Sequence, residues 1–400
     1  MKPREILVGK TVYDQREMDA VNEVMRGGWL GVGKATDMFE KRVAKFVGHK
    51  YGIATNSGSS ALLLAVTALN LPKGSKVIVC AAGFPATVAP ILHAGLVPVF
   101  VDAEMTSYSL DIEQIHIVEG NTMDSVKAIV FAHTVGNVAN MDKIMAFAKK
   151  HHLIVIEDIC DALGAKWNGK QVGSFGDIAC LSFYPSHHIT AGGLGGMCLT
   201  SNAQYAQDMI SLRDWGKMHE TPEYYNAYSV ESKYFIKIDG IDYDYRYSYS
   251  HVGYNLKPAD INSAFGLAQM KRLPTFIKKR NANFLDIYDL FPDEYFIKPA
   301  WHKEAQPSWF NYPVVVREDA PFDRDEIVRY FEQNKIRCRL FFAGNITRQP
   351  AFKGKGIIVG KLPVSDDLMK NAFLIACHPA LSSDDIKYIG STLRAFLDEF

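Results

Sequence analysis

Residues that could bind a phosphate occur in the segment TNSGSSA, at positions 55–61 of this 400-residue chain. Small hydroxyl residues and one glycine there precede a helical pattern at Ser60–Ala68. The N–H groups at a helix N-terminus carry partial positive charge, and serine hydroxyls beside them add donors. The segment therefore indicates an anion site, and an ordinary helix cap is the alternative interpretation.

A carboxylate at the end of a predicted buried strand is a second candidate. Asp158 stands in IVIEDICDALGA, directly after an apolar run. At such a place it could pair with the protonated nitrogen of a heteroaromatic cofactor ring. A helix cap or a buried salt bridge would use the same residue type, so this motif alone leaves both roles open.

Two adjacent histidines follow another strand-like run, in LSFYPSHHITAGGLGG at positions 181–196. Ser182 stands at the end of the run, and a glycine-rich turn follows the histidines. An imidazole with a pKa near neutral can act as a general base, and a purely structural role is less expected for His187 than for its neighbour. A structural role suits His188. Neighbouring histidines could also bind a metal ion, but no third ligand follows at a fixed spacing, so we predict no metal site.

Strand-like and helix-like runs alternate over the first half of the chain. This alternation is typical of an α/β fold with a mainly parallel central sheet and helices on both faces. Ligands of such sheets bind at the carboxyl ends of the strands, which is where Asp158 and Ser182 are expected. The runs are SKVIVC, Thr87–His93, LVPVFVD, KAIVFAHTV, MDKIMAFAKKHH and LIVIED, after helical patterns at Gln15–Arg26 and Asp37–Val47.

The second half of the chain contains a polar excursion, a helical region and a mixed tail. Residues 216–250 are rich in Tyr, Glu and Ser and lack periodicity, which predicts a long loop. Within it, Lys217–Tyr249 is the candidate for substrate selection. A long helical region follows at 258–291. Short strands and helices then alternate, which predicts a smaller C-terminal α/β domain, and we place the two domains at 1–285 and 286–400.

Composition excludes several classes of partner. Lys+Arg and Asp+Glu number 44 each, so the formal net charge is zero and indicates neither nucleic acid nor an anionic membrane as a partner. The N-terminus lacks the apolar core of a secretory signal, and no apolar run is long enough to cross a bilayer. We therefore expect a cytoplasmic protein, whose six scattered cysteines are free thiols.

The order and spacing of these segments resemble the DegT-type sugar aminotransferase family, whose members are fold-type-I pyridoxal-phosphate enzymes. The resemblance covers nearly the whole chain. It implies an aspartate-aminotransferase-like fold, with pyridoxal 5′-phosphate or pyridoxamine 5′-phosphate as the cofactor. The matching pieces are NSGSSAL, GFPATVAP, VFVD, IEDICDALGA, GSFGDIACLSFYPSHHIT, GGLGG, GYNLKPADINSAFGLAQMKRL and IRCRLFF.

The resemblance also implies which residues bind the phosphate of the cofactor. Gly58, Ser59 and Ser182 would contact this phosphate from within the same chain. Asn255, in GYNLK, would reach the phosphate of the neighbouring subunit, which implies a homodimer with shared active sites.

Three further residues would contact the cofactor ring. By the resemblance, Phe84 would stack on the pyridine ring, Asp158 would pair with its nitrogen, and Asp161 would lie near its hydroxyl group. A protonated ring nitrogen allows the ring to withdraw electrons, so Asp158 is counted among the catalytic residues.

The chain departs from the family at one position. Ordinary members carry a lysine five residues after the serine of the SF motif, and that lysine forms an imine with the cofactor. Here the position is His187, and no lysine stands at 186–188. An imidazole cannot form a stable imine, so the cofactor should be held noncovalently, with His187 as the base. The string SFYPSHHIT resembles the subgroup of 3-dehydratases that act on nucleotide-activated 4-keto-6-deoxysugars in ascarylose- and colitose-type pathways.

The cysteines distinguish two branches of that subgroup. Ascarylose-type members carry a [2Fe-2S] cluster and work with a reductase, whereas colitose-type members take their electrons from glutamate. A cluster needs four soft ligands, but only Cys160 stands in a cluster segment and no cysteine occurs between Cys198 and Cys338. L-Glutamate is therefore the expected donor, and a 4-keto-3,6-dideoxysugar is the expected product.

Three alternatives remain beside this interpretation. The first is an ascarylose-type dehydratase that needs an external reductase although it lacks the cluster. The second is a catalytically inactive, PLP-binding regulator, and the third is an aminotransferase that uses a displaced lysine such as Lys166. The identity of the nucleotide and of the sugar is left open by the sequence.

Overall fold

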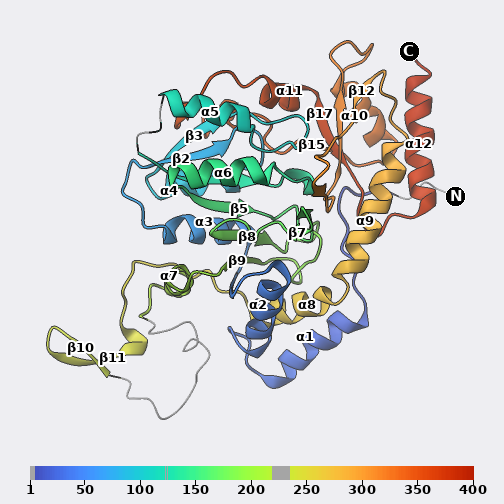
Figure 1. Cartoon of the computed structure of the whole chain (residues 1–400). Helices are drawn as coiled ribbons and strands as arrows, with labels where there is room; N and C mark the ends of the chain where they lie inside the picture. The colour runs from blue at the N-terminus through green and yellow to red at the C-terminus, as the bar shows by residue number, and fades with distance from the viewer. Residues whose placement is uncertain (1–4, 122, 124, 219–234) are drawn as a thin grey trace.

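A large twisted sheet forms the centre of the computed structural model, which describes residues 5–121, 123, 125–218 and 235–400 (Figure 1). Its strand order is β1-β9-β8-β5-β4-β2-β3-β16. Within this sheet β9 pairs antiparallel with both β1 and β8, and the other neighbours pair in parallel. The strands are β1 (Tyr51–Thr55), β2 (Lys76–Cys80), β3 (Val97–Val101), β4 (Val126–Ala132), β5 (Ile154–Asp158), β8 (Ile178–Ser182), β9 (Gly196–Thr200) and β16 (Ile357–Ile358).

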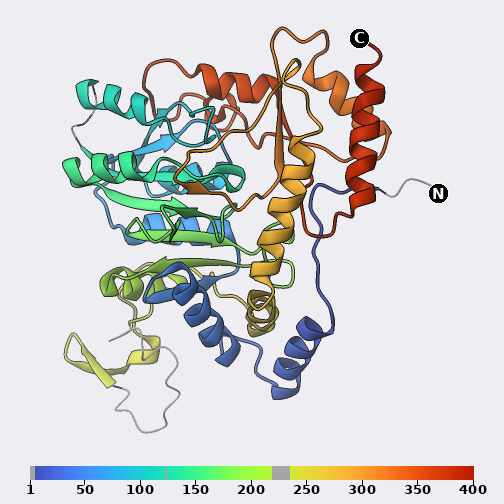
Figure 2. The same cartoon turned by 45° about the vertical axis from the view of Figure 1, so that its right-hand side comes forward.

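Two layers of helices cover the two faces of this sheet, as Figures 1 and 2 show. Successive strand residues point to opposite faces, so that Val77 and Val79 pack with α3, α4 and α7, whereas Ile78 packs in the layer that contains α2, α5 and α6. The predicted α/β fold with a mainly parallel sheet is confirmed. The helices are α2 (Lys34–Val47), α3 (Gly58–Ala68), α4 (Pro85–His93), α5 (Ile112–Asn121), α6 (Met141–His151) and α7 (Ala203–Arg213).

The C-terminal part of the chain forms a separate four-stranded antiparallel sheet in the order β12-β14-β17-β15. The division between residues 285 and 286 falls within α9 (Leu273–Tyr288) and stays a prediction. The remaining elements of this part are β12 (Phe296–Ile297), β14 (Tyr312–Val316), β15 (Arg339–Leu340), β17 (Ala372–Ile375), α10 (Arg324–Gln333), α11 (Pro363–Asn371) and α12 (Ser383–Leu397).

Two contacts attach this C-terminal part to the far edge of the large sheet. Strand β16 pairs in parallel with Val99 and Phe100 of β3. The buried carboxylate of Asp102, just after β3, accepts hydrogen bonds from the N–H groups of Val364 and Ser365 in the first turn of α11, at 2.8 and 2.7 Å. No sequence pattern indicates β16, because a two-residue strand has no periodicity to detect.

The excursion predicted as a loop contains a β-hairpin, so that prediction was wrong in this part. Strands β10 (Phe235–Ile238) and β11 (Ile241–Asp244) pair antiparallel around Asp239 and Gly240, whose φ angles are +49° and +85°. An Asp-Gly pair suits the left-handed conformations of such a two-residue turn. The rest of the excursion, at 219–234, lies outside the described residues.

Short elements complete the described fold. A three-stranded sheet joins β6 (Lys166–Trp167), β7 (Lys170–Gln171) and β13 (Ala305–Gln306). The predicted long helical region is divided into α8 (Asp260–Met270) and α9, with Pro274 in the first turn of α9. No helix among the described residues has both the length and the apolar character needed to cross a membrane.

A buried carboxylate of α8 caps α2 from outside the helix. The N-cap position of α2 is Gly33, which has no side chain to accept the free N–H groups of the first turn. Asp260 accepts hydrogen bonds from the N–H groups of Gly33 and Thr36 at 3.1 and 2.8 Å, and from the Thr36 hydroxyl at 2.7 Å. It therefore joins α8 to α2, the helix that packs on β1.

Replacing Asp260 with alanine should lower the free energy of unfolding by about 2–4 kcal/mol, because several buried donors would lose a charged acceptor. Urea denaturation followed by circular dichroism measures this change. The control variant Asp319→Ala removes an exposed partner of Arg317 and should change the stability by less than about 1 kcal/mol. Equal losses in the two variants would contradict the capping role.

Candidate active site

Three neighbouring parallel strands end at one cavity of about 420 Å³. Strands β4, β5 and β8 finish at Ala132, Asp158 and Ser182, and all three final residues line this cavity. The carboxyl ends of adjacent parallel strands lie at one edge of the sheet, so their polar side chains gather there. The prediction that Asp158 and Ser182 lie together is therefore confirmed.

The N-terminus of α3 closes one side of the cavity. Ser57 caps the helix by accepting the N–H group of Ser60 at 3.1 Å, while the N–H groups of Gly58 and Ser59 have no acceptor within the described chain. A Cβ atom at Gly58 would lie only 2.6 Å from Cβ of Ser182, so only glycine allows this close approach. The uncommitted N–H groups and the serine hydroxyls form a cradle for an anionic group.

The Asp158 carboxylate is fixed in place by two donors. Its Oδ2 accepts the Thr87 hydroxyl at 2.8 Å, and its Oδ1 accepts the backbone N–H of Cys160 at 3.1 Å. Only 5% of the residue is exposed. Such a carboxylate is positioned to pair with a cationic or protonated group of a ligand in the cavity.

His187 lines the same cavity between an aromatic ring and a carboxyl group. Its ring stacks on Phe310 with centroids 4.9 Å apart, and its Nδ1 lies 3.5 Å from Oδ1 of Asp161. Burial, together with the positive charge of Arg280, lowers the pKa of His187 to about 3. The sequence-based expectation of a near-neutral pKa was therefore wrong for this site, and the imidazole is neutral at physiological pH.

The pKa of Asp161 shifts in the opposite direction. Burial, with a smaller contribution from the Asp158 carboxylate, raises the pKa of Asp161 to about 7. The backbone N–H of Val135 donates to its Oδ2 at 3.3 Å and partly offsets this increase. A carboxyl group that titrates near neutrality thus faces the neutral imidazole of His187, and the pair can hold or release a proton at physiological pH.

Arg280 of α9 fixes the backbone around His187. It is buried, with 1% of the residue exposed. Its Nη2 donates to the carbonyl oxygens of Ser186 and His187, both at 2.8 Å, and its Nη1 donates to that of Phe310 at 2.7 Å. No carboxylate lies within ion-pair distance of it among the described residues. Arg280 therefore positions both the imidazole and the ring that stacks on it.

The structure brings together seven of the eight residues predicted for the site. Phe84 is the N-cap residue of α4 and stands half-exposed on the cavity wall. Asn255 does not line this cavity; it is exposed and pairs with Asp214 in an isolated bridge. The residues that line the cavity are Gly58, Ser59, Phe84, Asp158, Asp161, Ser182 and His187.

The sequence analysis missed several residues that complete the site. Phe310 and Arg280 lie more than 90 positions after His187, and no local pattern indicates that they contact it. Thr87 had a usable signal, because it begins the predicted helix Thr87–His93 and follows Phe84 by only three positions. Phe342 and Tyr184 line the cavity as well.

The other histidine and the nearby cysteine have packing roles. His188 is buried, and its Nε2 lies 2.9 Å from the carbonyl oxygen of Ser308. Cys160 lines the cavity, but burial raises the pKa of its thiol well above the usual value. Within the described chain no group of three His, Cys, Asp or Glu side chains converges on a point where a metal ion could bind.

Replacing Asp161 with asparagine should make the stability of the cofactor-free protein less sensitive to pH. Because the pKa of Asp161 rises from 3.8 to about 7 on folding, the folded state binds more protons than the unfolded state between these values. Its contribution to stability therefore falls as the pH rises through this window. Asp161→Asn should gain stability relative to the unaltered protein between pH 5 and pH 8, by up to about 4 kcal/mol.

Urea denaturation at several pH values measures this difference. The control Asp384→Asn changes an exposed carboxylate of α12 and should give a difference that hardly varies with pH. A flat difference for Asp161→Asn would show that its carboxyl group titrates normally.

The sheet, the cradle at α3 and the Asp158 carboxylate define the class of the protein as a fold-type-I pyridoxal-phosphate-type fold. The sequence pattern of the DegT/DnrJ/EryC1/StrS aminotransferase family matches residues 12–394. The chain belongs to this family, as the sequence analysis predicted.

Curated relatives and solved structures agree with this assignment. Lipopolysaccharide biosynthesis protein RfbH of Salmonella typhimurium (strain LT2) is 38% identical to the chain, over 96% of this chain and 90% of that protein. The dTDP-4-dehydro-2,6-dideoxy-D-glucose 3-dehydratase of Saccharopolyspora spinosa is 35% identical, over 96% and 85%. A crystal structure of GDP-4-keto-6-deoxymannose-3-dehydratase with a trapped PLP-glutamate geminal diamine matches with a TM-score of 0.87 at 26% identity, over 97% of this chain and all of that one.

Proposed function

We propose that the chain is a pyridoxal-phosphate-dependent 3-dehydratase of a nucleotide-activated 4-keto-6-deoxysugar, with L-glutamate as the donor. The product would be a 4-keto-3,6-dideoxysugar. One observation carries the proposal: His187 lines the cavity that gathers the cofactor-binding groups, and none of the described lining residues is a lysine. Membership of the family alone indicates a pyridoxal-phosphate-dependent enzyme that modifies sugars.

The described residues fit pyridoxal phosphate. The N–H groups of Gly58 and Ser59 and the Ser182 hydroxyl suit its phosphate, the Asp158 carboxylate suits its ring nitrogen, and Phe84 suits a ring face. When bound, this cofactor supplies an electron-withdrawing ring that takes up electrons from one substrate and returns them to the next. Thr87 and the Cys160 N–H hold Asp158 so that its negative charge stays directed into the cavity.

His187 is the proposed base. Its neutral form has a free lone pair at physiological pH, and Asp161 faces Nδ1, which leaves Nε2 as the proton acceptor. Ionisation of Asp161 would favour the imidazolium and so strengthen His187 as a base. The stack on Phe310 and the hydrogen bonds from Arg280 to the backbone limit rotation of the imidazole. A proton is therefore taken and returned along one direction.

Glutamate is the proposed donor because the chain lacks the cysteines for an iron–sulfur cluster. The 3-dehydratase whose structure holds a PLP-glutamate adduct supports this choice. The dehydratase from Saccharopolyspora spinosa acts on a dTDP-sugar and the solved dehydratase on a GDP-sugar, so both names support a nucleotide-linked substrate. An external reductase remains the competing source of electrons.

A homodimer with shared active sites completes the proposal. Asn255 is exposed between half-buried neighbours and lies outside the cavity of its own chain, which suits contact with a second copy. The backbone of this segment is fixed by hydrogen bonds such as Trp215 N–H to the Tyr254 carbonyl oxygen at 2.6 Å.

Borohydride should not attach the cofactor covalently to the chain, because no lysine side chain lines the described cavity. The protein is loaded with pyridoxal phosphate, reduced, digested and analysed by mass spectrometry. Only unmodified lysine peptides are expected, with the cofactor recovered by dialysis. A reduced cofactor adduct on any lysine, Lys166 included, would contradict the proposed noncovalent binding.

Replacing His187 with asparagine should slow loss of the C3 oxygen at least a hundredfold while the cofactor stays bound, because the base is removed and the shape is nearly kept. Turnover is measured with glutamate alone, without a reductase, on a panel of nucleotide 4-keto-6-deoxysugars, by the mass of the product. His93→Asn, which changes an exposed residue of α4, should behave like the unaltered protein.

Three results would oppose the proposal. Unchanged turnover in His187→Asn would place the base elsewhere. Turnover that appears only after a reductase is added would favour the reductase-dependent alternative. Cofactor binding without turnover under either condition would favour the regulator.

A further inference from the structure

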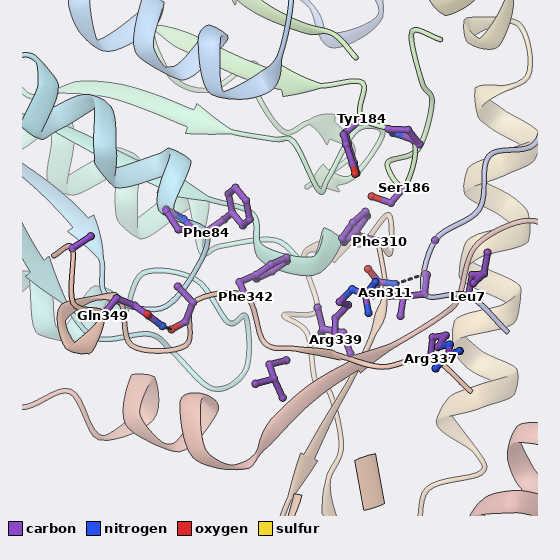
Figure 3. Close-up of a pocket in the computed structure, with 18 of the residues that line it drawn as sticks. Leu7, Phe84, Tyr184, Ser186, Phe310, Asn311, Arg337, Arg339, Phe342 and Gln349 are labelled. Carbon is purple, nitrogen blue, oxygen red and sulfur yellow. Dashed lines mark hydrogen bonds between the residues drawn. The ribbon is translucent and has the colours of Figure 1, made fainter. Parts of the chain in front are cut away.

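A second and larger cavity adjoins the cofactor cavity. Its volume is about 970 Å³, and it lies between the N-terminal segment 7–9 and the chain around β15. In Figure 3, Tyr184 and Ser186 lie on one side of it, Arg337 and Arg339 on the other, and Phe310 and Phe342 between them. The two cavities lie side by side, because both are lined by Phe84, Tyr184, Ser186, Phe310 and Phe342.

The lining of the larger cavity is positively charged. Its described residues include two arginines and no carboxylate. Arg337 and Arg339 stand two positions apart on an extended segment, which places them on the same side of it, and Cys338 between them is buried. The cavity therefore favours an anionic ligand.

Only one of the two arginines is available to a ligand. Arg337 pairs with Glu5 and, at 2.6 Å, with Glu332. The other Glu332 oxygen accepts the Cys338 N–H at 2.7 Å. Arg339 is exposed, and within the described chain its side chain makes one hydrogen bond, from Nη1 to the Cys338 carbonyl oxygen at 2.9 Å. Within the described chain it has no carboxylate partner, so most of its five N–H donors are uncommitted.

The amide side chains of the lining are already engaged. Nδ2 of Asn311 donates to the carbonyl oxygens of Val8 and Ile375 at 3.0 and 3.2 Å. Nε2 of Gln349 donates to that of Ala343 at 2.8 Å. Arg339 is therefore the main charged donor that this cavity offers to an anion, beside the hydroxyl groups of Tyr184 and Ser186.

We propose that Arg339 binds the diphosphate of the nucleotide-activated sugar in the larger cavity, which rests on the proposed function. A guanidinium group can donate two parallel hydrogen bonds to phosphate oxygens. Glutamate also carries anionic oxygens, but the cavity is far larger than an amino acid. Its aromatic side chains suit a nucleobase and a sugar, and its position beside the His187 cavity suits a ligand whose sugar lies near the imidazole.

Binding of nucleoside diphosphates to the cofactor-loaded protein tests the proposal without turnover. GDP, CDP, UDP and dTDP are titrated by calorimetry, and the four nucleosides without phosphate serve as reference ligands. Arg339→Gln should weaken binding of the tightest-binding diphosphate about ten- to a hundredfold, because a charged hydrogen-bond donor is lost. Binding of the corresponding nucleoside should not change. The affinity of Arg339→Lys for the diphosphate should lie between those of the unaltered protein and Arg339→Gln. The control Arg329→Gln changes an exposed arginine of α10 outside the lining and should bind normally.

A second measurement distinguishes the two sources of anionic oxygen. Conversion of the bound cofactor by glutamate is followed by its absorbance, and Arg339→Gln should change the glutamate dependence by less than about threefold. A large loss there with normal diphosphate binding would assign Arg339 to the glutamate carboxylate and overturn the proposal. Failure of the unaltered protein to bind any diphosphate, or equal binding by both proteins, would overturn it as well. Arg339-dependent diphosphate binding in a protein that does not dehydrate would refute the proposed function alone.

Discussion

The start of α3 packs on the ends of β8 and β9 so tightly that two positions must be glycine. A Cβ atom at Gly58 would lie 2.6 Å from Cβ of Ser182, and one at Gly196 would lie 2.2 Å from the carbonyl oxygen of Ser57. Ser182 and Gly196 are partners in the β8–β9 register. The loop that carries His187 therefore begins and ends at this contact. The anion cradle and the loop of the proposed base are consequently attached at the same contact, and a shift of α3 would move both together.

The pKa values of His187 and Asp161 depend on Arg280, although its guanidinium group forms no ion pair with the carboxylates of the cavity. Arg280 gives its guanidinium donors to three backbone carbonyl groups and leaves its charge uncompensated by any ion pair in the described chain. This charge opposes protonation of His187 and helps Asp161 to ionise. Burial acts in the opposite direction on Asp161 and dominates. The result is a neutral imidazole beside a carboxyl group that titrates near neutrality, an arrangement that neither residue type would produce at the surface.

The sequence predicted the parts of the fold and site that depend on local patterns. The alternating apolar runs indicated β2 to β5 and the helices α4 and α6, and the strand-end positions of Asp158 and Ser182 indicated a ligand site there. Phe310 and Arg280 could not be found in this way, because they reach His187 only through the packing of distant elements. Two-residue strands such as β16 also leave no pattern. The Asp239–Gly240 turn did leave one, and the low periodicity of the surrounding excursion obscured it.

The attachment of the C-terminal part at β16 limits how the molecule can open. Ile357 and Ile358 pair with β3, and the start of α11 rests on Asp102 at the same edge. A rigid-body rotation of the C-terminal sheet about a hinge would have to break these hydrogen bonds in every cycle. These bonds therefore oppose any entry of a ligand that depends on a swing of the C-terminal part away from the large sheet.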